Sequence, residues 1–307
     1  MRILLTGASG QLGAYLLREL LTAGEEVTAW SGSRRGELFG APLGPVDVAD
    51  DEAVAAAFHR ARPDAVLHAA AVASIAECHR DPERARRVNV GGTATLAKLA
   101  AAGGARLVLV STDLVFDGEH APYREADPPA PLSAYGRSKA DAEAAALAAP
   151  RAAVARVSLL FGRSLAGRPS FFDQQAEALR AGRPVTLFAD EWRTPLHLAS
   201  AARALAALAR SDFAGVLHVG GPERLSRLEM GQCLAHFLGV GPGVIVAARR
   251  ADAAAAGPRP RDVSLDSRAF RERFPFWLQK DGAADGEGDF ETECRAMLAV
   301  DTAARAS

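Results

Sequence analysis

Tyr135 and Lys139 are the two residues whose types and spacing most directly indicate chemistry. They lie in a segment predicted to be helical, where a spacing of four places both side chains on one face, a single turn apart. A tyrosine hydroxyl has an ordinary pKa near ~10 and exchanges protons poorly at neutral pH. A nearby ammonium and the first turn of a helix both favour the phenolate. The pair therefore predicts that Tyr135 is a general acid/base whose pKa Lys139 lowers.

Chance is the alternative source of this spacing. The chain has three tyrosines and only three lysines, so a coincidental pair is expected in roughly 3% of such sequences. Nearly all of the positive charge is arginine, so a lysine here indicates a position that needs a compact ammonium rather than a planar fork. A second motif is needed to separate catalysis from coincidence.

Ser111 and Thr112 stand at the end of an apolar strand predicted over residues 106–110. A proline-rich loop then leads into the helix of Tyr135. Ligands of α/β proteins bind beyond the carboxyl ends of the strands. We therefore expect this hydroxyl pair to hydrogen-bond a substrate oxygen beside the tyrosine.

A glycine-rich turn near the start of the chain predicts the cofactor that this chemistry needs. An apolar strand over residues 2–6 leads into glycines at 7, 10 and 13, and a helix with a leucine face follows. The glycines would permit the tight turn, the close approach of a pyrophosphate and the packing of the helix on the strand, respectively. The pyrophosphate would lie on the helix N-terminus. The predicted contacts are Gly7, Ser9, Gly10, Gln11, Leu12 and Gly13. A plain strand-to-helix turn is the alternative reading.

The second strand, over residues 26–30, ends without the Asp or Glu that would hold a 2′-hydroxyl of the adenine ribose. It leads instead to Ser31, Ser33 and Arg34. Hydroxyls and a guanidinium suit a 2′-phosphate, so this loop favours NADP (NADPH) over NAD, which stays possible. A solvated arginine-rich loop is the alternative.

Strands alternate with helices along the first half of the chain, which indicates a parallel sheet covered on both faces. We predict an α/β fold: a Rossmann-type doubly wound parallel sheet with a smaller C-terminal substrate-capping region. Residues 1–160 form the NADP-binding domain, whose sheet also receives segments from about 185–221. Residues 161–280 form mainly the small substrate-binding region, and 281–307, which are rich in Gly, Asp and Ala, a flexible tail.

Composition excludes several function classes. The 307 residues are 49% hydrophobic and 24% charged with a net charge of −1, so nothing indicates nucleic acid or an anionic membrane as a partner. The three cysteines are widely spaced and predict neither a disulfide framework nor a zinc site. No basic leader or apolar span is recognisable. We expect a cytoplasmic protein without a metal.

The two motifs together resemble the extended short-chain dehydrogenase/reductase family, which combines Gly-x-x-Gly-x-x-Gly with Tyr-x-x-x-Lys. By the spacing of that family, Thr112 is the catalytic hydroxyl of its pair. The resemblance also implies cofactor contacts beyond the glycine turn: Asp47 and Val48 beside the adenine, Ala69, Ala70 and Ala71 along the cofactor, Asn89 in support of the site, and Ser111, Tyr135 and Lys139.

Three segments, 111–118, 122–127 and 131–139, resemble the branch that holds dTDP-4-dehydrorhamnose reductase and the β regulatory subunit of methionine adenosyltransferase. The reductase resemblance implies that NADPH delivers hydride to C4 of a nucleotide-linked 4-keto-6-deoxy sugar. Tyr135 would protonate the alkoxide, Thr112 would hold that oxygen, and Lys139 would grip the nicotinamide ribose. Asp113 and Arg193 are the other implied substrate contacts, Arg193 for the diphosphate. A regulatory subunit, or an epimerase or dehydratase, is the alternative, and a homodimer is compatible with either.

Three departures from the branch bear on the substrate. Leu114 and Leu159 stand where rhamnose reductases usually carry aromatic substrate contacts, and Tyr15 stands where some have a Glu that serves a dimer-bridging metal. The resemblance therefore predicts the cofactor but not the sugar.

Overall fold

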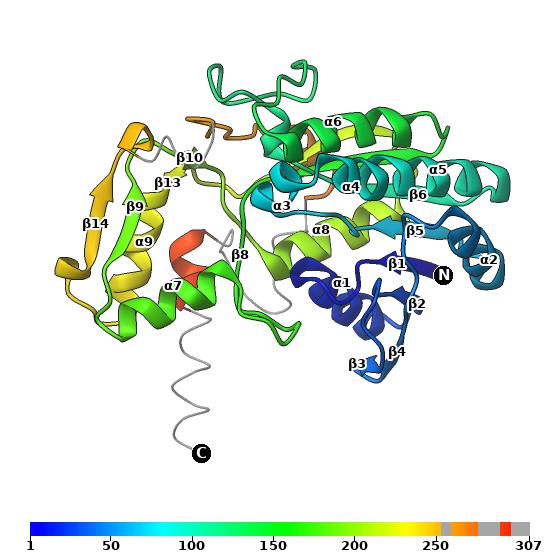
Figure 1. Ribbon diagram of the computed structural model, residues 1–307, viewed down its shortest axis with the longest axis horizontal. Coiled ribbons are helices and arrows are strands. Elements are labelled where there is room, and N and C mark those ends of the chain that lie inside the picture. The colour runs from blue at the N-terminus through cyan, green and yellow to red at the C-terminus, as the bar shows by residue number, and fades with distance from the viewer. Residues whose placement is uncertain (253–258, 276–288, 296–307) are drawn as a thin grey trace.

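An eight-stranded sheet organises the chain, in the strand order β12–β7–β6–β5–β1–β2–β4–β3 (Figure 1). The computed structural model describes residues 1–252, 259–275 and 289–295. All pairings in this sheet are parallel except that of β3 with β4. The strands are β1 (Arg2–Thr6), β2 (Glu26–Trp30), β3 (Glu37–Leu38), β4 (Ala41–Gly44), β5 (Ala65–His68), β6 (Arg106–Thr112), β7 (Ala152–Val157) and β12 (Gly215–Val219).

Helices cover both faces of this sheet, which confirms the doubly wound fold. On one face lie α1 (Gln11–Thr22) and α8 (Leu198–Arg210), and on the other α2 (Asp51–Ala61), α5 (Gly92–Gly103) and α6 (Ala134–Leu147). Successive strand residues point to opposite faces. Ile3 and Leu5 therefore enter the α1/α8 core, whereas Leu4 enters the other. This burial on both faces explains why the strands read as continuous apolar runs.

The helix expected over residues 81–101 is divided. It consists of α4 (Pro82–Arg86), a π-helical turn η1 (Arg87–Gly91) and α5, and α3 (Ile75–Arg80) precedes it. The extra residue of a π-turn is a common feature of functional sites. Here the turn contains Asn89, which it places inside the protein.

The N-terminus of α6 fixes the position of Tyr135. Ser133 caps the helix by accepting a hydrogen bond from the Gly136 N–H at 3.0 Å. A Cβ on Gly136 would lie 2.2 Å from the Leu114 carbonyl oxygen, so only glycine lets the helix approach the turn η2 (Asp113–Val115) this closely. The residue after the tyrosine is therefore required by packing.

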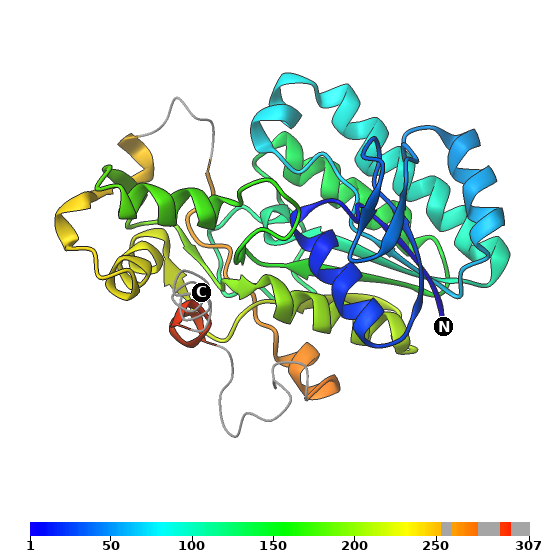
Figure 2. The ribbon, with the colours of Figure 1, turned by 90° about the horizontal axis from the view of Figure 1, so that it is seen from below.

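A smaller body packs beside the carboxyl edge of the sheet (Figure 2). It contains α7 (Phe171–Arg180), α9 (Arg227–Phe237) and the strand pair β9 (Val185–Phe188) and β14 (Ile245–Ala248), with the short helix η3 (Pro242–Val244). Two further short pairs connect the bodies: β8 (Leu160–Phe161) with β11 (Leu196–His197), and β10 (Trp192–Arg193) with β13 (Leu225–Ser226).

The sheet order and the packing add detail to the predicted division into two interleaved parts. Of the strands between 185 and 221, only β12 joins the main sheet, because β9, β10 and β11 pair with strands of the smaller body or its connections. Conversely, α8 and α10 (Arg268–Arg273) pack on the main body although both lie within residues 161–280.

Part of the segment expected to be a flexible tail is packed. Residues 290–295 are helical, with the Phe290 ring 4.4 Å from that of Phe161 and Cys294 fully buried. The prediction was wrong for this part because three side chains, Phe290, Glu293 and Cys294, are buried in a segment of mainly polar composition. The rest of the predicted tail lies outside the described residues.

The three cysteines carry no disulfide. Among the residues that the structure describes, no helix has both the length and the apolar character needed to cross a bilayer.

Candidate functional site

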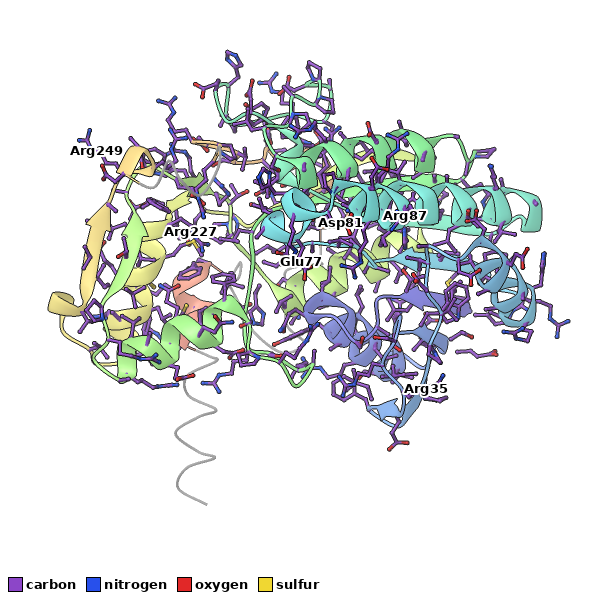
Figure 3. The ribbon with its side chains drawn as sticks, viewed as in Figure 1. Arg35, Glu77, Asp81, Arg87, Arg227 and Arg249 are labelled. Atoms are coloured by element: carbon purple, nitrogen blue, oxygen red, sulfur yellow. The ribbon has the colours of Figure 1, made fainter. Side chains whose placement is uncertain are left out.

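A cavity of about 1140 Å³ lies between the carboxyl edge of the main sheet and the smaller body. Figure 3 labels Glu77 from α3 and Arg227 from α9, which line it from the two sides. Most of the predicted site residues meet in this one cavity: Gly7, Gly10, Gln11, Leu12, Gly13, Ala69, Ala71, Ser111, Thr112, Asp113, Tyr135, Lys139 and Arg193.

The glycine turn is built as the sequence predicts. Gly7 has φ 72°, and a Cβ on Gly13 would lie 1.9 Å from the Gly7 carbonyl oxygen, so both positions require glycine. At Gly10 the nearest obstacle to a Cβ would be that same oxygen at 3.1 Å. Gly10 caps α1 without a side-chain bond, so the first N–H groups of the helix face the cavity. The turn therefore fits the pyrophosphate of a dinucleotide.

The residues predicted to bind the adenosine half lie in the loop after β2, outside the cavity lining. Ser31 hydrogen-bonds the Arg34 carbonyl, and the Ser9 hydroxyl donates to the Ser31 carbonyl at 3.3 Å. The Arg34 guanidinium donates to the Ala166 carbonyl at 2.9 Å, and Ser33 is exposed. The residues predicted to bind the adenosine half thus lie close together, but the Arg34 guanidinium already has a hydrogen-bond partner within the protein.

Four other residues that were predicted to contact the cofactor make contacts within the protein instead. The Asp47 carboxylate accepts a hydrogen bond from the Ala49 N–H at 3.0 Å, and Val48 is buried, with its carbonyl 2.6 Å from where a Cβ on Gly92 would lie. The Ala70 N–H donates to the Thr6 hydroxyl at 3.2 Å.

Asn89 is the fourth, and its amide ties two parts of the site together. Its oxygen accepts from the Val72 N–H at 2.8 Å, and its nitrogen donates to the Val72 carbonyl at 3.1 Å and to the Ser138 hydroxyl at 2.9 Å. Val72 follows the cavity-lining alanines after β5, and Ser138 lies on α6 between Tyr135 and Lys139. Asn89 therefore holds the loop after β5 against the helix that carries the tyrosine.

The Thr112 hydroxyl connects Tyr135 with Asp113. It hydrogen-bonds the phenol, donates to the Asp113 carboxylate at 3.3 Å and accepts from the Leu114 N–H at 3.2 Å. Burial raises the pKa of Asp113, and the Arg193 guanidinium, 3.9 Å away, opposes this. The Ser158 hydroxyl also donates to Asp113, at 3.0 Å. A buried hydroxyl with fixed partners is suited to holding an oxygen of a bound substrate.

The pKa of Tyr135 departs from the prediction. Burial raises it well above its usual value, the Asp113 carboxylate adds to the rise, and only the Thr112 hydrogen bond acts in the opposite direction. The expected lowering by Lys139 was wrong for this state because the phenol is desolvated, an effect that the sequence does not reveal. The hydroxyl is thus held protonated, which is the form that donates a proton.

Lys139 is also buried, with 2% of its surface exposed. Burial lowers its pKa to about 8, and the Glu143 carboxylate, one turn further along α6, acts to raise it. Glu143 is held by the Arg156 guanidinium at 2.8 Å and by the Ser111 hydroxyl. Ser111, predicted to contact the cofactor, thus donates its proton to Glu143.

Glu143 and Arg156 are site residues that the sequence reasoning missed. The spacing of four from Lys139 to Glu143 was available as a signal, because it places the carboxylate on the face of the ammonium. Arg156, on β7, has no such local signal.

The arginines that line the cavity from the smaller body differ in how closely carboxylates pair with their guanidiniums. Arg193 lies 3.1 Å from Glu191 and also faces Asp113. Arg259 lies farther from Glu191, at 3.7 Å. Arg227 lines the cavity with a buried Nη1 that has no hydrogen-bond partner among the described residues. The abundance of arginine in the sequence concealed Arg227 and Arg259, yet Arg227 keeps a nitrogen that could bind an anionic ligand.

Tyr15 lies inside the fold, 5% exposed, and donates its hydroxyl to the Arg163 carbonyl at 2.8 Å. Within the described ranges, no cluster of three or more His, Cys, Asp or Glu is arranged to hold a metal ion. The position that serves a metal in some similar reductases is here an internal contact.

Comparison with known proteins places the chain in a family. Residues 1–281 match the family described as RmlD substrate binding domain. Methionine adenosyltransferase 2 subunit beta of Mus musculus is 34% identical over 242 residues, which are 76% of this chain and 71% of that protein. The dTDP-4-dehydrorhamnose reductase of Mycobacterium tuberculosis is 32% identical over 275 residues, 87% of this chain and 85% of that protein.

A solved structure shows the same fold. The dTDP-4-dehydrorhamnose reductase of Bacillus anthracis, in complex with NADP, aligns with a TM-score of 0.82 at 21% identity, over 97% of this chain and 99% of that one.

Proposed function

The chain belongs to the RmlD substrate binding domain family and is an NAD(P)-dependent oxidoreductase of the extended short-chain dehydrogenase/reductase type, and from this premise we propose that it reduces a nucleotide-activated 4-keto-6-deoxy sugar with NADPH. One observation carries the proposal. Thr112, Tyr135 and Lys139 line the same cavity as the glycine turn, so an acid, an oxygen-binding hydroxyl and a dinucleotide cradle are assembled together.

The residues of the cradle fit the cofactor. The turn from Gly7 to Gly13 and the N-terminus of α1 would hold the pyrophosphate, and the loop with Ser31 and Arg34 would hold the 2′-phosphate. When bound, NADPH supplies the hydride. The small residues Ala69 and Ala71 leave room beside the backbone on the way to the catalytic groups.

Tyr135 is the general acid of this mechanism. Its raised pKa keeps the phenol protonated until an alkoxide develops on the substrate, and that negative charge then takes the proton. Thr112 would hold the same oxygen by turning its hydroxyl proton from Asp113 to the substrate, while the Leu114 N–H keeps the hydroxyl oxygen in place. Lys139, one turn from Tyr135 on α6, would grip the nicotinamide ribose.

The diphosphate of the substrate would lie against the smaller body. The Nη1 of Arg227 is buried without a hydrogen-bond partner among the described residues, and the Arg259 guanidinium lies 3.7 Å from the Glu191 carboxylate. Charge-assisted bonds to a diphosphate suit both guanidiniums. Arg193, proposed for this task on sequence grounds, is better placed to hold Asp113 and Glu191 in position.

A second function stays open, that of an NADP-binding regulatory subunit. The identity of 34% to a methionine adenosyltransferase subunit beta favours it. The complete set of Thr112, Tyr135 and Lys139 in one cavity favours chemistry instead.

Turnover distinguishes the two. The purified chain is incubated with NADPH and a panel of dTDP-4-keto-6-deoxy sugars, and loss of NADPH absorbance is followed, with NADPH alone as the blank. We expect oxidation with at least one sugar. Nucleotide binding without oxidation of any panel member would instead support the regulatory subunit, and a sugar isomerised without net NADPH loss would support an epimerase.

A further inference from the structure

Residues 163–168, here called the strap, cross from the smaller body to the dinucleotide-binding half. They connect β8 with α7. Figures 1 and 2 both show this green loop beside the first turn of α1. Three side chains of the dinucleotide-binding half donate hydrogen bonds to strap carbonyls: Gln11 to Arg168 at 2.7 Å, Tyr15 to Arg163 at 2.8 Å, and Arg34 to Ala166 at 2.9 Å.

The strap is ordered from both sides. Leu165 packs against the α1/α8 core, and Ala166 is 4% exposed. On the other side, the Ser164 N–H donates to Asp173 of α7 at 2.9 Å. Gly167 has φ 78°, a left-handed conformation that favours glycine and turns the chain before Arg168.

The strap contributes a positively charged residue, Arg168, to the cavity that contains the glycine turn. Arg168 lines the same cavity as Gly10 and Gly13, and its carbonyl is bonded to Gln11 of that turn. Its side chain is exposed, and no carboxylate in the described part of the chain pairs with its guanidinium. The N-terminus of α1 contributes only a partial positive charge, equivalent to roughly half an elementary charge. A pyrophosphate at this turn therefore has an additional full charge within its cavity.

We infer that the strap closes over the bound dinucleotide and that Arg168 binds its pyrophosphate, which makes the segment before α7 part of the cofactor site. The inference rests on the cofactor in the proposed function but not on the sugar. Tyr15 is a positioning residue in this arrangement, because its hydroxyl holds the strap from outside the cavity lining. The strap must open for the nucleotide to leave.

Binding measurements on the full chain test the role of Arg168. The probes are NADP⁺, NAD⁺ and adenosine 2′-monophosphate, of which the last carries the 2′-phosphate but no phosphate at the pyrophosphate position. We expect Arg168→Ala to weaken the binding of NADP⁺ and NAD⁺ alike, by about tenfold, and to leave the binding of adenosine 2′-monophosphate unchanged. Arg183→Ala removes an exposed arginine that pairs with Glu177 of the same body, and should change none of the three. Unchanged NAD⁺ affinity in Arg168→Ala overturns the inference, as does an equal loss of affinity for adenosine 2′-monophosphate.

Tyr15→Phe tests the closure itself. We expect faster hydrogen–deuterium exchange of the strap amides and faster release of NADP⁺ by stopped flow, each by severalfold. Faster exchange without faster release would mean that the strap does not cover the nucleotide, and unchanged exchange would mean that Tyr15 does not hold it. Because no sugar is present, these results are independent of whether turnover is found.

Discussion

Glu143 and Arg156 form a buried ion pair, with 2.8 Å between Oε2 and Nη2, one helical turn from Lys139. Both side chains are under 6% exposed, and the Ser111 hydroxyl also binds the carboxylate. The Glu143 carboxylate, neutralised by Arg156, thus lies one turn from the Lys139 ammonium. Loss of this ion pair should therefore change both the stability of the fold and the pKa of Lys139.

Glu143→Gln should destabilise the fold and shift the pH profile. Leaving the Arg156 charge buried without its partner costs about 3–5 kcal/mol, measurable by urea denaturation. Removing the carboxylate that raises the pKa of Lys139 should drop that pKa below its value of about 8. The alkaline limit of activity should then move to lower pH. Glu177→Gln, at an exposed pair, is the control. A profile that does not move would show that Glu143 has no electrostatic effect on Lys139.

Lys139→Met should make the ligand-free protein more stable at neutral pH. Because burial depresses the pKa of Lys139 from 10.5 to about 8, the unfolded chain binds the extra proton between these values. The buried ammonium therefore costs about 3 kcal/mol below pH 8, and this cost fades as pH rises to 10.5. The gain from the substitution, followed by denaturation at several pH values, should fade in the same window. A gain independent of pH would contradict this account.

Tyr135→Phe should reduce turnover by at least about a hundredfold while NADP⁺ binding persists. The substitution removes one hydroxyl, the acid held protonated by its raised pKa. Tyr123→Phe is a matched control, since that hydroxyl serves the loop before α6 by accepting from the Gly118 N–H. Turnover that survives in Tyr135→Phe would eliminate the tyrosine as acid.

Arg34→Ala should weaken NADPH more than NADH, by about tenfold in the ratio of dissociation constants, because only NADPH carries the 2′-phosphate. A smaller loss common to both is expected from the broken contact with Ala166. Arg35, exposed and labelled in Figure 3, provides the control variant Arg35→Ala. Equal losses of affinity for both cofactors would show that Arg34 does not bind the 2′-phosphate.

Arg227→Ala should raise KM for the nucleotide sugar by about tenfold or more and leave the affinity for NADP⁺ unchanged. Arg227 lines the cavity, and its buried Nη1 has no hydrogen-bond partner among the described residues, whereas Arg249, labelled on the same body in Figure 3, is exposed. Arg249→Ala is therefore the control. If KM is the same in both variants, the diphosphate is held elsewhere.

The parts of the site that the sequence predicted are those determined by local geometry. The glycine turn depends on backbone conformations at Gly7 and Gly13, and the spacing of four in α6 is a property of any helix. Each of these signals is contained in a few consecutive residues and does not depend on how the rest of the chain folds. The parallel, doubly wound sheet was predicted in the same way, from strands and helices in alternation.

The features that the sequence did not predict depend on contacts between distant segments. The pKa of Tyr135 is governed by desolvation, which arises only when the cavity walls have assembled. Arg156 meets Glu143 from another strand, and Arg227 faces the cavity from the smaller body. The packing of residues 290–295 depends on an aromatic contact with Phe161, more than a hundred positions earlier.

The three bonds that hold the strap are all accepted by main-chain carbonyls. A carbonyl is present whatever side chain a residue carries, so substitutions within residues 163–168 leave these acceptors in place. The exceptions are Gly167, because of its left-handed conformation, and Leu165 and Ala166, because their side chains are packed in the protein. For protein engineering, this makes the strap a segment whose remaining side chains can be varied to change ligand preference without removing its attachment to the rest of the protein.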